Sequence, residues 1–92
     1  MATQILSVAD TGAASSDVTI AAGDTLTVSL KTTTGSPPPA NARVIIKLKD
    51  DNSVYHAIED ELNAQTPSLV IAGAGTFQFY RCPGASVGVF SA

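Results

Sequence analysis

The sequence predicts an all-β fold, a single compact antiparallel β-sandwich that is immunoglobulin-like or jelly-roll-like and has about eight short strands. Apolar and polar residues alternate with a period of two in several segments, which is the pattern of half-buried strands. Clusters of Gly, Pro, Asn and Asp separate these segments, and 92 residues fit one domain. We assign residues 17–92 to the sandwich and residues 1–16 to an N-terminal arm or a first strand.

The first expected strands run from Ile5 to Val8 and from Val18 to Ile20. Ala21 to Asp24 has turn composition, and the strand Thr25 to Lys31 follows, with its three Leu and Val residues facing one side. We therefore predict that Asp17 to Lys31 forms a β-hairpin.

Gly35 to Asn41 contains three consecutive prolines, which lack backbone donors and favour polyproline geometry, so this segment is expected to be an exposed, stiff loop. The next strand, Arg43 to Lys49, alternates again, with Ile45 as an apolar exception on its polar face. Asp50 to Ser53 then turns the chain.

Val54 to Leu62 is ambiguous, because apolar residues at i, i+4 and i+8 suit a helix while its first residues suit a strand. We favour a short strand followed by an acidic turn at Glu59 to Glu61. Leu69 to Ile71, Thr76 to Arg81 and Val87 to Phe90 complete the strands.

The inward-facing positions of these strands give a predicted core. It is small, which favours help from partner subunits. Its members are Val18, Ile20, Leu26, Val28, Leu30, Val44, Ile46, Leu48, Leu69, Ile71, Phe77, Phe79, Val87 and Val89.

Charged residues make up only 14% of the chain, so we expect another chain to cover part of its surface. The net charge is −3 and the five Lys and Arg are scattered, which argues against nucleic acid as a partner. The N-terminus resembles no signal peptide and no apolar run approaches the length of a membrane span. We expect synthesis in the cytoplasm and no membrane association.

No segment carries a motif that points to catalysis. Ala72 to Thr76 is glycine-rich, but a strand pattern follows it where a phosphate-binding loop needs a helix, so we interpret it as a hairpin turn. Tyr80-Arg81-Cys82 matches the Tyr-x-Cys of an immunoglobulin strand, but its partner cysteine and core tryptophan are absent. Cys82, the only cysteine, is expected to be a small, buried or half-buried residue at a strand end.

The only histidine, His56, would need ligands from the acidic residues at 50–51 or 59–61 to form a metal site, and their clustering is equally typical of solvated turns. We predict no enzyme activity, no catalytic residue, no metal and no cofactor. The surface expected to contact a neighbouring subunit or another chain is the proline loop, with Pro37, Pro38, Pro39 and Asn41 as its candidate residues.

The chain resembles small virion β-sandwich proteins of tailed bacteriophages, and among these it is most similar in character to the capsid decoration, or cement, proteins. The resemblance is carried by four segments, Val18 to Asp24, Ser68 to Ile71, Gly75 to Arg81 and Val87 to Phe90. The resemblance covers most of the chain and carries over no catalytic residue, since its motifs are glycine-turn hairpins.

This resemblance implies a structural protein that decorates and stabilises the outer surface of an icosahedral capsid, with the major capsid protein as partner and a homotrimer as oligomer. It implies a location on the virion, and an N-terminal segment, Ala2 to Ser16, that is either an arm ordered on the shell or a plain flexible terminus. The alternative function is an immunoglobulin-like binding module of a tail or head fibre that attaches to the host surface.

Overall fold

A computed structural model describes residues 2–92, and all regular structure within this range is β-strand. The strands pack as two antiparallel sheets, which confirms the predicted all-β sandwich. The nine strands of the described range are β1 (Thr3–Ala9), β2 (Ala13–Ala14), β3 (Val18–Ile20), β4 (Thr25–Lys31), β5 (Arg43–Lys49), β6 (Tyr55–Asn63), β7 (Ser68–Ala72), β8 (Gly75–Arg81) and β9 (Val87–Ser91).

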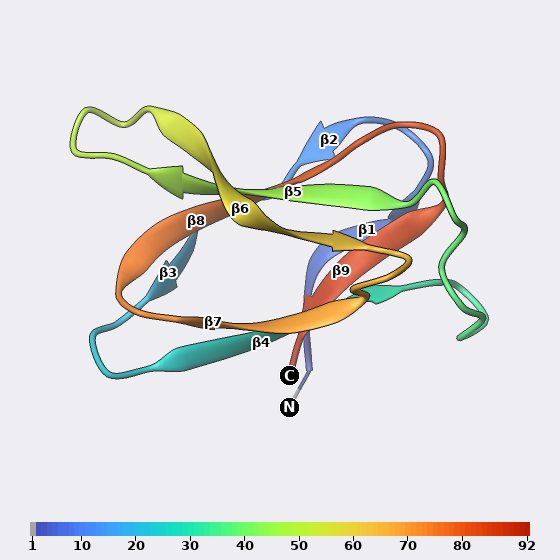
Figure 1. Cartoon of the computed structure of the whole chain (residues 1–92), viewed down its shortest axis with the longest axis horizontal. Coiled ribbons are helices and arrows are strands. Elements are labelled where there is room, and N and C mark those ends of the chain that lie inside the picture. The colour runs from blue at the N-terminus through green and yellow to red at the C-terminus, as the bar shows by residue number, and fades with distance from the viewer. Residues whose placement is uncertain (1) are drawn as a thin grey trace.

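The strand order identifies the sandwich as a jelly roll. Sheet A has the order β1-β9-β4-β7, and sheet B has the order β2-β8-β5-β6, with β3 also pairing with β8. The pairs are nested along the chain: β1 pairs with β9, β2 and β3 with β8, β4 with β7, and β5 with β6. This is the pairing of one long hairpin wrapped into two facing sheets, as Figure 1 shows. Of the two predicted sandwich types, the jelly roll is therefore correct.

Two predicted hairpins are wrong, although their turns are correctly placed. The turn before β4 closes with Asp24 N–H donating to the Ala21 carbonyl at 3.0 Å, and Gly23 has a φ of 85° that favours glycine. However, β3 belongs to sheet B and β4 to sheet A, and the glycine turn at Gly73 likewise joins β7 of sheet A to β8 of sheet B. Local turn chemistry specifies a reversal but not the sheet that receives the next strand.

The predicted acidic turn at Glu59 to Glu61 is also wrong, because β6 continues through it. The pairing of β5 with β6 shifts register between Ile45, which faces Glu61, and Lys47, which faces Ala57. Two extra residues of β6 are accommodated there as a bulge. A bulge exposes acidic side chains as a turn does, so composition alone does not separate the two.

The segment 1–16 contributes two strands to the described fold. β1 forms an edge of sheet A and buries Leu6, while β2 pairs with β8 in sheet B. Between β2 and β3, Ser15 bridges the break in the edge strand: its amide donates to the Phe79 carbonyl at 2.8 Å, and its hydroxyl accepts from the Phe79 amide at 3.0 Å.

The core between the sheets contains most of the predicted residues. Ten of the fourteen are buried, and Val18, Leu26 and Leu69 are half-buried and pack against them. The prediction that Leu48 belongs to the core is wrong, since this residue is 37% exposed. Leu48 lies near the end of β5, where the β5–β6 hairpin projects beyond the rest of the sandwich (Figure 1). Four buried hydrophobic residues were not predicted, namely Leu6, Ala42, Leu62 and Ala85.

The most unusual core residue is Arg81, at the end of β8, which is only 3% exposed. Its guanidinium donates to the carbonyls of Thr11 at 2.6 Å, Ser7 at 2.5 Å and Val87 at 3.3 Å. Because Ser7 lies in β1 and Val87 in β9, the side chain spans from sheet B to sheet A. Hydrogen bonding to several carbonyls compensates for removing the charge from water.

Candidate docking surface

The outward side of sheet A forms a distinct surface, which we call the A face. Its side chains alternate with the buried ones along β4, β7 and β9, and cross-strand pairs place them in rows, such as Gln4–Phe90–Ser29–Ser68. The A face consists of Gln4, Thr25, Thr27, Ser29, Lys31, Ser68, Val70, Ala72 and Phe90.

The A face carries only one charged side chain, Lys31, whose ammonium donates to the Gln4 side-chain carbonyl at 2.5 Å. Apart from Gln4, the other side chains are small, hydroxylic or apolar, and Val70, in the edge strand β7, is 58% exposed. Burying such residues costs far less free energy than burying charges, and the centres of protein interfaces are depleted in charged residues. The A face is therefore suited to contact with another protein.

A hollow of about 370 Å³ adjoins the A face, between β4 and the proline loop. Pro37 and Pro38 line it from the loop, Pro67 from the β6–β7 connection, and Phe90 from the A face. The two loop prolines predicted as contact residues thus lie beside the A face, on a segment that is loop as predicted.

The other two predicted contact residues lie elsewhere. Pro39 accepts a hydrogen bond from the Ala42 amide at 3.0 Å and lines neither the proline hollow nor the hollow around Asn41. The Asn41 amide donates to the Gly84 carbonyl at 3.0 Å, and its hollow, of about 390 Å³, is shared with Arg43 and Glu61. The four residues therefore do not form one surface.

The outward side of sheet B, the B face, has the opposite character. Its cations come from β5, and each has a partner within the chain: the Arg43 guanidinium lies 2.6 Å from the Glu61 carboxylate, and the Lys47 ammonium lies 5.0 Å from the ring centroid of Tyr80. Lys49, the third, is paired with Asp17 and Tyr55. Each of the three cations of the B face thus has a partner within the chain.

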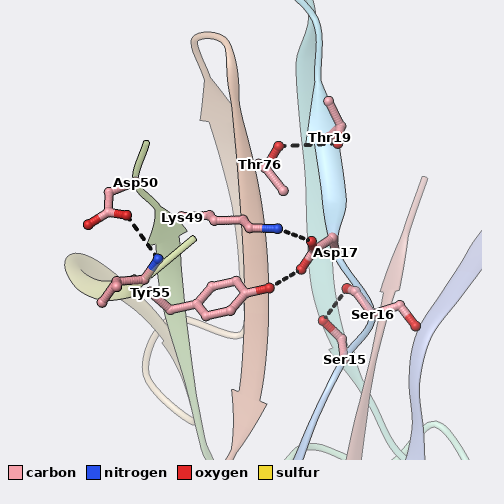
Figure 2. A network of polar contacts seen from close by, with 9 residues as sticks. Ser15, Ser16, Asp17, Thr19, Lys49, Asp50, Tyr55 and Thr76 are labelled. Carbon is pink, nitrogen blue, oxygen red and sulfur yellow. Dashed lines mark hydrogen bonds and ion pairs between the residues drawn. The ribbon is translucent and has the colours of Figure 1, made fainter. Parts of the chain in front are cut away.

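Asp17 holds three elements together, as Figure 2 shows. It lies between β2 and β3, and its carboxylate accepts hydrogen bonds from the Tyr55 hydroxyl of β6 at 2.5 Å and the Lys49 ammonium of β5 at 3.0 Å. These bonds, that of Tyr55 first, lower the pKa of Asp17, while Asp17 raises the pKa values of Tyr55 and Lys49. The cluster stabilises the connection between the edge strand and the β5–β6 hairpin.

His56 and Asp50 form a separate pair in the β5–β6 hairpin, with 2.8 Å between Nε2 and Oδ2. Asp50 also accepts from the amides of Val54 at 2.9 Å and Asn52 at 2.8 Å, and these bonds, that of Val54 first, lower its pKa. The imidazole side chain is 63% exposed. Within residues 2–92, no three His, Cys, Asp or Glu side chains lie close enough to hold a metal ion.

The remaining candidates for chemistry have structural places. Cys82 is half-buried and follows the last residue of β8, as predicted. The glycine-rich turn leads directly into β8, so no helix N-terminus faces it. The A face could not be predicted from the sequence, because the topology decides which strands share a sheet and therefore which side chains share an outward face.

No protein-family model, no curated protein and no solved structure matches this chain. No helix long and apolar enough to cross a bilayer occurs in the described part of the chain.

Proposed function

We propose that this protein is a structural, non-enzymatic virion protein that decorates and stabilises the outer surface of an icosahedral phage capsid. In this role it binds the major capsid protein, works as a homo-oligomer and is located on the capsid surface. The observation that carries the proposal is the separation of charge between the two outward faces: the A face has the single charge of Lys31, while the B face carries internally paired cations.

Docking removes water from the covered surface, so the charges on that surface decide what docking costs. A surface of Thr, Ser, Ala and Val can be covered by a partner without leaving ionised groups unpaired, whereas the charges of the B face would each lose water. The adjoining proline hollow adds a stiff, concave rim, because prolines lose little conformational entropy when they are buried. These features favour docking of sheet A on a protein surface.

The alternative function, a fibre module that attaches to host surface sugars, has less support. Jelly rolls occur both in viral capsid proteins and in lectins, so the fold permits either function. A sugar site needs exposed aromatic rings, however, and of the five aromatic residues Phe77 and Phe79 are buried in the core. The rings of Tyr55 and Tyr80 lie under the ammonium groups of Lys49 and Lys47, so Phe90 is the one aromatic ring left that could contact a sugar.

The test is immunogold labelling of purified particles of the virus that encodes the chain, combined with add-back of recombinant protein to particles stripped of it. We expect label over the capsid shell, restored by the wild-type protein. Thr27→Lys places a charge at the centre of the A face and should abolish the restored label. Thr19→Lys, at a strand threonine that is also exposed but lies on the B face, should not. Label confined to tail fibres, or equal add-back of both variants, would contradict the proposal.

A further inference from the structure

We propose that the free edge of β7 is a self-association site, at which β7 of a second copy pairs antiparallel with it around a twofold axis through Val70. The inference stands on strand geometry alone and does not require the proposed function. It would extend sheet A across both copies and join their A faces into one surface.

Three of the four sheet edges carry features that hinder pairing with another chain. β1 has two register shifts against β9. β6 has a bulge and the acidic residues Glu59, Asp60 and Glu61. The opposite edge of sheet B consists of the short strands β2 and β3, separated by a break. Bulges, charges and short strands are the usual protections of sheet edges.

β7 lacks all of these protections. It pairs with β4 over five consecutive residues without a register shift, and its sequence Ser-Leu-Val-Ile-Ala contains neither charge nor proline. Val70, in the middle, is 58% exposed. A regular, uncharged and apolar edge strand of this kind is a template for strand addition.

The hydrogen-bonding pattern shows which backbone groups of β7 face the free edge. Leu30 N–H donates to the Pro67 carbonyl at 2.7 Å, so this pair is hydrogen-bonded, and alternation makes Val28–Leu69 and Leu26–Ile71 hydrogen-bonded as well. The Thr27 backbone fits this alternation, because its carbonyl accepts a hydrogen bond from the Ala92 amide at 3.0 Å and so points toward β9 and away from β7. The N–H and C=O groups of Ser68, Val70 and Ala72 therefore point away from β4.

A second copy fits this edge because β7 is self-complementary. With Val70 opposite Val70 of the second copy, Ser68 lies opposite Ala72 of that copy, and each of these pairs can exchange two N–H···O=C bonds. The side chains match too, since Leu69 lies opposite Ile71 on the core side and two valines meet on the A face. Such a twofold pair differs from the trimer that the resemblance implied.

The test is amide hydrogen exchange by NMR at 20 µM and 1 mM protein, in 0.5 M NaCl so that repulsion between the acidic β6 strands on the same side is screened. We expect the Val70 and Ala72 amides to exchange slowly at 1 mM and rapidly at 20 µM, with Leu69 and Ile71 slow at both. Val70→Pro removes the edge donor without touching the β4 ladder and should give a folded monomer, whereas Val70→Thr should still dimerise.

Rapid exchange of Val70 at 1 mM would overturn the proposal, as would unchanged association of Val70→Pro. Protection that arises only when capsid particles are added would also overturn it, because the occupant would then be a partner chain. The experiment distinguishes failure of this proposal from failure of the docking proposal. If the Val70→Pro protein is monomeric and still labels particles, docking does not depend on the β7 pairing. If the protein dimerises but labels no particle, the β7 pairing holds and the docking proposal fails.

Discussion

At the residue scale, a few polar side chains fix the geometry that the small apolar core alone would leave loose. Arg81 spans the two sheets through carbonyls of β1, β9 and the β1–β2 loop. Ser15 substitutes for strand pairing at the break between β2 and β3. Asp17 ties that edge to β5 and β6. Each of these residues connects segments that lie far apart in the sequence.

The Asp17 cluster predicts a specific pH dependence of stability. Folding lowers the pKa of Asp17 from its ordinary value of 3.8, so its stabilising effect is fully present above that value and is lost as the pH falls through the lower folded pKa. Asp17→Asn should therefore lower the thermal midpoint at pH 7 and approach the wild type below pH 3.8. Asp24→Asn, in an exposed turn, is the matched control, and a pH-independent gap for Asp17→Asn would contradict the assignment.

At the element scale, periodicity predicted strands well but not their partners. The alternation in Thr25 to Lys31 correctly indicates which side of β4 is buried, because a half-exposed strand needs one apolar side. The partner of β3 is β8, more than fifty residues later, and no local pattern encodes a pairing at that distance. The buried position of Arg81 was equally invisible, since its hydrogen-bonding carbonyls come from other strands.

The proline loop is predicted to contribute to docking without contributing to the fold. Replacing Pro37, Pro38 and Pro39 by glycine should preserve the sandwich, because the segment is outside the strands, at a cost of roughly 0.4 to 1 kcal/mol per position from added freedom of the unfolded chain. It should weaken add-back to particles, since Pro37 and Pro38 form the rim of the hollow. Glycine at Asp51 and Asn52, in the β5–β6 turn, is the control; binding that survives the proline replacement would remove the loop from the docking surface.

At the scale of the whole molecule, the jelly-roll topology distributes the basic side chains unequally between the outward faces of the two sheets. Three of the five basic residues project from β5 on the B face, Arg81 is buried, and Lys31 alone reaches the A face. The composition correctly indicated a weakly charged surface, but its location depends on which strands share a sheet, and that is a property of the topology. The sequence therefore predicts that a weakly charged surface exists, but it does not predict which strands form that surface.

Hydroxyl-radical footprinting of the protein, free and bound to purified virus particles, tests whether the A face is the docking surface. Phe90 and Tyr80 are a matched pair, because both are half-buried aromatic residues, one on each outward face. We predict that binding lowers the modification of Phe90 and leaves that of Tyr80 unchanged. Protection of Tyr80 with Phe90 unaffected would show that the contact lies on the charged B face and that the A face is not the docking surface.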